Sequence, residues 1–193
     1  MTDTPTDTSF FTSPAQRHDA VTQAIHWATL FAVVIAVVAG WAMEEMPKGD
    51  AKTQVVNLHA SFGVLVLALT AFRLLWRTAA PAVEPLQRPF WLYLAAKTMQ
   101  VALYGLLAAI PISGVLMMAA KGRSFEVFGL FSMAPLIAPD RALGHSLADV
   151  HEVLANVMIG LVGLHTMAAL LHQWALRDGA LARMLPFGRT GRA

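Results

Sequence analysis

The amino-acid sequence predicts an all-α fold, a bundle of four transmembrane helices, and three observations lead to that prediction. Only 13% of the 193 residues are charged and 56% are hydrophobic, whereas a soluble domain carries about a quarter of charged residues. Each predicted helix corresponds to a run without any charged residue. The runs are residues 20–43, 53–72, 98–120 and 153–176. Every run reaches the roughly 20 residues that a helix needs to cross a bilayer.

The chain begins with residues 1–19, which are rich in Thr, Ser and Pro and lack the basic start of a secretory signal. We expect a flexible tail there, one membrane domain over residues 20–176, and a basic tail over residues 177–193. The first run is longer than a signal-peptide core and shows no clear cleavage site, so it should stay as a helix. The short connection at residues 44–52 makes the first two helices antiparallel neighbours.

The second connection, residues 77–93, contains three prolines and joins the second and third helices. Pro111 is predicted to kink the third helix. The third connection runs from Lys121 to about Leu147 and includes an apolar stretch at residues 127–139. This stretch is too short to span a bilayer, so we expect it to lie on the membrane surface or to cover the outer end of the bundle.

The distribution of basic residues predicts the orientation. Nine Lys and Arg residues fall on the side of the N-terminus, the second connection and the C-terminus, and five fall on the opposite side. By the positive-inside rule, both termini are predicted to be cytoplasmic. The net charge of +2 gives little electrostatic support for nucleic-acid binding.

The chain contains no Cys, which excludes disulfides, thiolate-bound iron–sulfur clusters and the covalent attachment of a c-type haem. Histidines are the remaining candidates for binding a cofactor, because polar side chains inside a bilayer are costly and often functional. His26 lies in the first predicted helix and His59 in the second, while His151 sits at the start of the fourth and His165 lies deeper in the same helix. Since the helices alternate in direction, His26 and His165 fall at the inner level and His59 and His151 at the outer level.

The spacing of His151 and His165 on the fourth helix allows both side chains to face the interior of the bundle at different depths. Fourteen residues separate His151 from His165, which is about 21 Å along a helix with roughly 40° of rotation. Helical bundles build cofactor sites from facing side chains, and imidazole is a common ligand of haem iron. Two stacked haems, each held between helices by two histidines, fit the number, depth and phase of these residues.

Several segments resemble the bacterial cytochrome b561 family over about Arg17 to Pro186. The segments are RHDAVTQAIHW, NLHASFGVLVLALTAFRLLWR, LYGLLAAIPISG, KGRSFEVFGL and DVHEVLANVMIGLVGLHTMAALLHQW. The resemblance implies a four-helix protein of the bacterial inner membrane that binds two haems b and exchanges electrons with quinone, with ubiquinone as the acceptor. It implies that His26 and His165 bind the inner haem iron, and His59 and His151 the outer one.

Other residues leave alternatives open. His172, one heptad after His165, is a second candidate for the inner ligand, and His18 and His145 are expected to be solvated. Arg17, Arg73 and Arg77 either pair with haem propionates or only anchor helix ends. Gly63 and Gly114 leave room for a ring or for helix packing.

Lys121, Arg123 and Arg141 give the third connection a positive field that either steers an anionic electron donor or is only solvated. The resembled family includes a type that oxidises superoxide and reduces ubiquinone, so superoxide is a candidate donor for an oxidoreductase of this kind. One alternative function is a cytochrome subunit of a larger dehydrogenase or hydrogenase. Another is a His-lined metal or proton transporter, which is disfavoured because the four runs contain no Asp or Glu.

Overall fold

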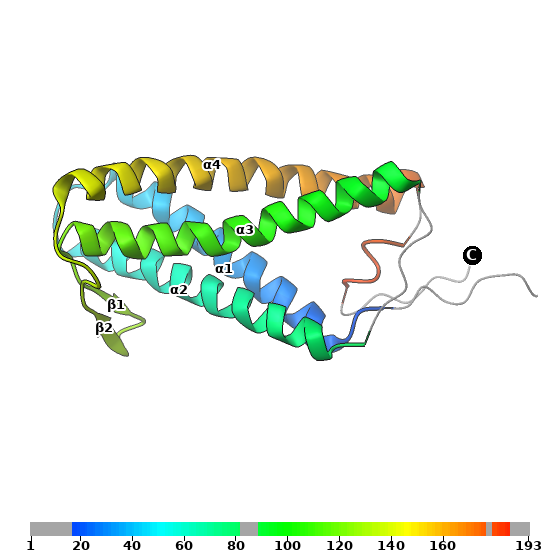
Figure 1. The fold of residues 1–193 in the computed structure, drawn as a ribbon, viewed down its shortest axis with the longest axis horizontal. Coiled ribbons are helices and arrows are strands. Elements are labelled where there is room, and N and C mark those ends of the chain that lie inside the picture. Colours follow the sequence, from blue (N-terminus) through cyan, green and yellow to red (C-terminus); the bar gives the residue numbers. More distant parts are fainter. Residues whose placement is uncertain (1–16, 82–88, 177–178, 186–193) are drawn as a thin grey trace, which may run out of the picture.

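Four long helices dominate the computed structural model, which describes residues 17–81, 89–176 and 179–185 (Figure 1). Each helix is long and apolar enough to cross a membrane, so the predicted four-helix bundle is confirmed. Most of both predicted tails lies outside the described residues. The helices are α1 (Ala20–Glu45), α2 (Asp50–Ala79), α3 (Phe90–Ala120) and α4 (Arg141–Leu171), and α4 continues into a π-helical turn, η1 (His172–Leu176).

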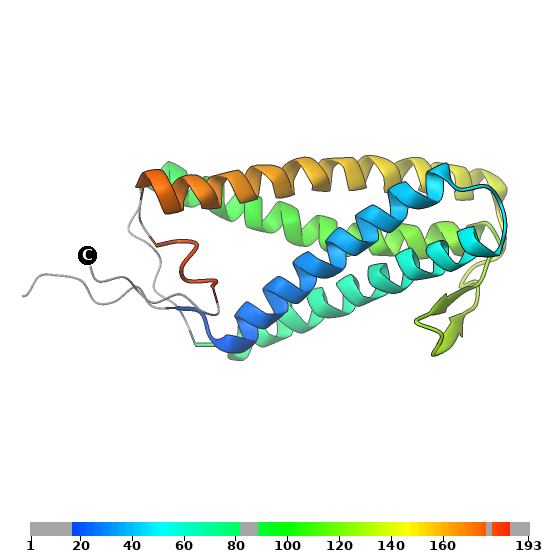
Figure 2. The same cartoon turned by 180° about the vertical axis from the view of Figure 1, so that it is seen from behind.

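The helices form two antiparallel pairs, α1 with α2 and α3 with α4, and contacts between α2 and α3 join the pairs. The pairs lie close together at the end where α1 meets α2 and α3 meets α4, and they diverge toward the opposite end (Figures 1 and 2). Following the predicted orientation, we call the first end outer and the second inner. α3 bends along its length (Figure 1), and it contains the buried Pro111.

The interior of the bundle is lined by small side chains, while large apolar ones point outward. Ala32 and Ala39 of α1 and Ala119 and Ala120 of α3 are buried, and small residues let helices approach closely where lipid removes the hydrophobic drive for association. Many large apolar side chains are more than half exposed, as expected for a surface that faces lipid. Examples are Phe31, Leu75, Val101 and Val153.

The fourth helix begins earlier than the sequence predicts. Asp140 caps it, because its Oδ1 accepts a hydrogen bond from the backbone N–H of Leu143 at 3.0 Å, and the helix starts at Arg141. The prediction that the third connection extends to Leu147 is therefore wrong. His145 lies in the second turn of α4, and His151 lies about 15 Å along it. Charged residues precede the apolar run of α4. The helix nevertheless begins before this run, because Asp140 caps its first turn outside the apolar segment.

The outer connection contains a small hairpin that an all-α prediction omits. Strands β1 (Phe125–Val127) and β2 (Phe131–Met133) pair antiparallel, and β1 packs against α2. Phe128 and Gly129 between them have φ values of 51° and 68°, a left-handed conformation that is common for Gly and rare for an aromatic residue. The backbone N–H of Phe128 donates to Ser61 Oγ at 2.8 Å, and its ring packs on Phe62. Contacts with α2 therefore hold the unusual turn.

Candidate functional site

Two of the predicted histidines meet at the outer level of the bundle. His59 of α2 and His151 of α4 have ring centroids 6.0 Å apart, with an angle of 72° between the ring planes. Both residues are partly buried. The structure therefore brings the outer pair together across the interior, from helices that belong to different antiparallel pairs.

Hydrogen bonds to backbone carbonyls orient both outer rings. His59 Nδ1 lies 2.8 Å from the Ala36 carbonyl oxygen on α1, and His151 Nδ1 lies 3.0 Å from the Ile110 carbonyl oxygen on α3. A carbonyl only accepts, so Nδ1 carries the proton in both rings and Nε2 keeps its lone pair. A metal-binding imidazole is usually oriented in this way.

A glycine lies beside each outer ring, one helical turn after the carbonyl that the ring contacts. A Cβ added at Gly40, four residues after Ala36, would lie 3.4 Å from His59 Cε1. A Cβ added at Gly114, four residues after Ile110, would lie only 3.1 Å from His151 Cε1. α1 and α3 thus present the same local arrangement, a carbonyl to orient the ring and a glycine to leave room for it.

Ser113 adds a further contact to His151. Its hydroxyl lies 3.0 Å from His151 Nδ1 and donates to the Ile110 carbonyl at 2.8 Å. Pro111, between these two residues, cannot donate a backbone hydrogen bond and distorts its turn of the helix. The distorted turn of α3 is therefore the part that fixes the His151 ring.

The outer pair has the spacing of two imidazoles that share one metal ion. A metal–nitrogen bond of about 2 Å on each side, plus roughly 1 Å from each nitrogen to its ring centroid, gives about 6 Å between the centroids. The centroids lie 6.0 Å apart. His59 and His151 would be the residues that hold a haem iron here, and the haem would supply the redox chemistry. No cluster of three or more His, Cys, Asp or Glu in the described parts of the chain could hold a metal ion.

The inner histidines are arranged differently. His26 of α1 is partly buried and His165 of α4 is exposed, and Arg73 of α2 lies close enough to affect the charge of both. Arg73 Nη1 lies 3.4 Å from His26 Nδ1, and its guanidinium lies over the Tyr104 ring at 5.5 Å. Because a guanidinium only donates, Nδ1 of His26 accepts here, which is the reverse of the outer rings.

The inner end of α1 carries two titratable residues next to this site. Burial and the nearby Arg183 lower the pKa of His18 below its ordinary value, although Asp19 opposes them. Partial burial raises the pKa of Asp19, but hydrogen bonds from Thr22 and from Trp76 Nε1 outweigh it and lower the pKa overall. Near pH 7, His18 is therefore neutral and Asp19 is charged, and Asp19 connects the start of α1 to the end of α2 through Trp76 at 3.0 Å.

The remaining predicted residues have varied surroundings. Arg17 donates to the Leu185 carbonyl, and Arg77 is exposed in the last turn of α2. His172 is partly buried at the start of η1, and His145 is exposed. A Cβ at Gly63 would meet nothing within 4 Å, so this glycine makes no close contact with another helix.

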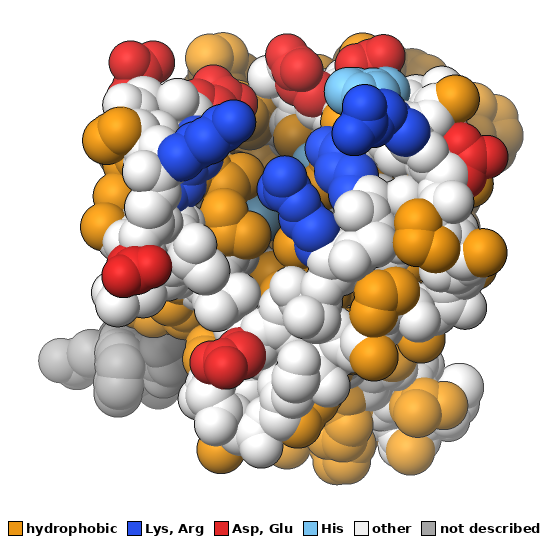
Figure 3. All heavy atoms as spheres, turned by 90° about the vertical axis from the view of Figure 1, so that its left-hand side faces the viewer, with side chains coloured by type: hydrophobic (Ala, Val, Ile, Leu, Met, Phe, Trp, Pro, Cys, Tyr) orange, Lys and Arg blue, Asp and Glu red, His pale blue; other side chains and the backbone are white. Residues whose placement is uncertain are grey.

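Both basic and acidic side chains lie at the outer end of the bundle. Lys and Arg side chains gather over the middle of this face, while Asp and Glu lie mostly at its edge (Figure 3). Lys121, Arg123 and Arg141 all belong to this end and are exposed.

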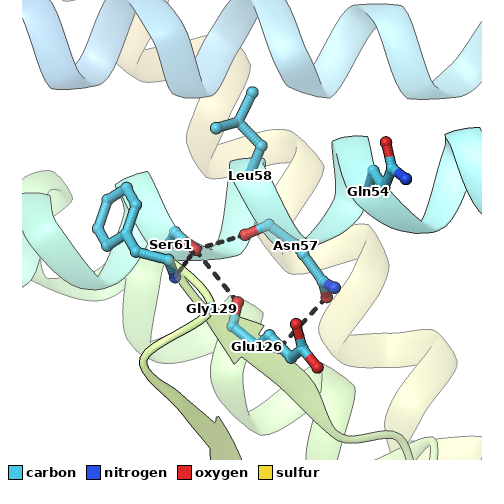
Figure 4. Close-up of a pocket in the computed structure, with 7 residues that line it drawn as sticks. Gln54, Asn57, Leu58, Ser61, Glu126 and Gly129 are labelled. Atoms are coloured by element: carbon cyan, nitrogen blue, oxygen red, sulfur yellow. Dashed lines mark hydrogen bonds between the residues drawn. The ribbon is translucent and has the colours of Figure 1, made fainter.

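A polar pocket lies beside this end, between α2 and the hairpin (Figure 4). Ser61 Oγ accepts from Phe128 N and lies 3.1 Å from the Glu126 carbonyl oxygen, to which it can donate, and Asn57 Oδ1 accepts from Glu126 N at 3.3 Å. Asn57 and Ser61 flank His59 on the same helix. The hydrogen bonds beside this pocket therefore hold the hairpin against the segment of α2 that carries His59.

Sequence reasoning missed Gly40, Ser113 and Ser61. The spacing Ala36-x-x-x-Gly40 is a known pattern of close helix contact, so it could have indicated a crowded neighbour of α1. The contacts of Ser113 and Ser61 are made with residues 38 and 67 positions away. Nothing in the local sequence indicates such partners.

Comparison with known proteins gives matches over most of the chain. The family described as prokaryotic cytochrome b561 matches residues 17–187. The chain is similar to two proteins of Escherichia coli K12, cytochrome b561 homolog 1 (32% identity, 84% of this chain and 93% of the other) and homolog 2 (32% identity, 91% and 94%). It is also similar to a Yersinia pestis protein named "probable superoxide oxidase CybB" (32% identity, 84% and 92%).

Proposed function

Because the chain belongs to the prokaryotic cytochrome b561 family, we propose that it is a di-haem cytochrome that moves electrons between an outer donor and membrane quinone. Membership of this family makes it a multi-pass protein of the bacterial inner membrane and a b-type cytochrome that transfers electrons. The number of haems, their ligands, the donor and the acceptor form the proposal.

The outer histidine pair is the single observation that carries the proposal. His59 and His151 have the centroid separation that one shared iron requires, and both present Nε2 with a free lone pair. The bound haems supply the one-electron redox chemistry. The protein supplies the orientation of the rings, through the carbonyls of Ala36 and Ile110, and an apolar bundle that limits the access of water.

For the inner haem we propose His26 and His165 as ligands. We propose also that Arg73 changes its hydrogen-bond partner when this haem binds. Ligation through Nε2 requires the proton of the His26 ring to lie on Nδ1, where Arg73 now donates. Arg73 must then turn to another acceptor. A haem propionate suits a guanidinium because both groups can form two parallel hydrogen bonds. Arg17 and Arg77 lie at the same end and are further candidates for this role.

We propose an anionic donor at the outer end, with superoxide as the candidate and ubiquinone as the acceptor. Oxidation of two superoxide anions to oxygen releases two electrons, which together with two protons reduce a quinone to a quinol. The exposed Lys121, Arg123 and Arg141 would raise the local concentration of the anion. The similarity to the Yersinia pestis protein named "probable superoxide oxidase CybB" supports this choice of donor.

The haem content tests the central proposal. The purified protein is expected to contain two haems b per chain by the pyridine haemochrome assay, with low-spin α bands after reduction by dithionite. The reason is that we propose one iron for each pair of histidines, and the chain has no Cys to bind a haem covalently. A protein that remains colourless after expression with ample haem would contradict the proposal.

The three basic residues of the outer connection and the start of α4 give a second expectation. Reversing the three charges, as Lys121→Glu, Arg123→Glu and Arg141→Glu together, is expected to slow reduction of the haems by superoxide about ten-fold at low ionic strength. The difference should shrink at high salt, because salt screens exposed charges. Stopped-flow absorbance would measure the rate, with Lys97→Glu on α3, outside the outer connection, as the control. Equal rates at low salt would exclude steering by these residues.

A further inference from the structure

A short segment after α4 returns to the start of α1. Residues 179–185, which we name the C-terminal strap, lie at the inner end between the two diverging helix pairs (Figures 1 and 2, red). The strap forms a compact turn, in which Arg183 N donates to the Gly179 carbonyl at 3.2 Å and Met184 N donates to the Leu181 carbonyl at 2.9 Å.

The strap is fastened to α1 through its backbone carbonyls. The Arg183 carbonyl accepts from His18 N at 3.2 Å and from Gln23 Nε2 at 3.3 Å. The Met184 carbonyl accepts from Trp27 Nε1 at 2.8 Å, and the Leu185 carbonyl accepts from Arg17. All four donors lie within residues 17–27. Because the acceptors are backbone atoms, these contacts fix the path of the strap itself.

Trp27 contacts the strap and His26 at once. Its indole N–H bonds to Met184, and its ring lies edge-on to the His26 ring, with centroids 5.4 Å apart and 74° between the planes. An indole N–H is a donor only and usually has a partner when it is buried. The bond to the strap therefore fixes the orientation of the ring that touches His26.

The strap lies at the inner end, where the helices that carry His26 and His165 belong to different antiparallel pairs. α1 carries His26 and packs mainly on α2, whereas α4 carries His165 and packs mainly on α3. The strap follows α4 in the sequence and binds α1. We propose that the strap sets the position of α1 relative to α4 at the inner end, and that Trp27 is the positioning residue that passes this constraint to His26. The inference rests on the proposed inner haem.

The test uses Trp27→Phe in the full-length, haem-loaded protein, because Phe keeps an aromatic ring beside His26 and removes only the indole N–H. Loss of one hydrogen bond changes an equilibrium by roughly five-fold. We therefore expect cleavage by trypsin after Arg183, followed by mass spectrometry, and transfer of the inner haem to apomyoglobin each to accelerate about five-fold. The electron paramagnetic resonance signal of the inner haem should also shift, with the outer signal unchanged and identified by its absence in His59→Ala.

Two further variants make the result specific. Trp41→Phe, an exposed tryptophan at the other end of α1, should leave all three measurements unchanged. Gln23→Leu removes the bond to the Arg183 carbonyl of the strap, together with a 2.7 Å bond to the His18 carbonyl. It leaves the pair of Trp27 and His26 rings in place, so it should also accelerate cleavage and inner haem transfer. It provides the same test if Trp27→Phe does not accumulate.

The outcomes separate the inference from the proposed function. Faster cleavage with an unchanged inner haem would show that the strap binds Trp27 without positioning His26, which overturns the inference. Unchanged cleavage in both strap variants would overturn it as well. A wild-type protein that lacks an inner haem would instead overturn the proposed function, independently of the strap.

Discussion

Replacing His59 or His151 with Ala is expected to remove the same haem, so that each variant keeps one haem b per chain. The two rings lie 6.0 Å apart with their Nε2 atoms free, and a bis-histidine iron loses an axial ligand when either ring is removed. The pyridine haemochrome assay gives the count. Electron paramagnetic resonance should show the same remaining low-spin signal in both variants.

The inner histidines supply the control for this prediction. His26→Ala should remove the other haem and leave the signal that His59→Ala lacks. His172→Ala should keep two haems per chain, because we propose His165 as the ligand on α4. If His26→Ala and His151→Ala lost a common haem, the assignment to two levels would be wrong. Loss of the inner haem in His172→Ala would transfer the ligand role from His165 to His172.

Gly114→Val is expected to weaken or abolish binding of the outer haem. A Cβ at this position would lie 3.1 Å from His151 Cε1 and 3.3 Å from its Nδ1, and the ring cannot move away without breaking its bond to Ile110. Overpacking of this kind costs about 1–3 kcal/mol, which corresponds to roughly a five- to 150-fold loss of affinity. Haem titration of the apoprotein, followed at the Soret band, would measure the loss.

Gly105→Val is the matched control for the effect of a β-branched residue in α3. Gly105 lies on the same helix, is exposed, and an added Cβ there meets nothing within 4 Å. Both substitutions change helix propensity in the same way, so the difference between them reports the crowding of His151. Equal haem affinities in the two variants would show that Gly114 is not needed as space for the ring.

Much of the fold follows from patterns that are local in the sequence. Runs without charge predict four spans because each helix must cover the bilayer by itself. The depth of a histidine follows from its place in its own run. The sequence predicts a later start for α4 than the structure shows, because Arg141, Asp149 and Glu152 precede the uncharged run. A capped helix extends beyond the hydrocarbon, where charge is no obstacle.

By itself, the sequence determined the four helices, the absence of Cys-based cofactors and the two levels at which histidines lie. Only the tertiary structure decided which carbonyl orients each outer ring, that Gly40 and Gly114 make room for the rings, that Arg73 contacts His26, and that the hairpin and the strap close back onto α2 and α1. The physical reason is the range of the forces involved. Hydropathy and helical period act within one segment, whereas these hydrogen bonds and contacts join side chains and carbonyls that are brought together only when the helices pack.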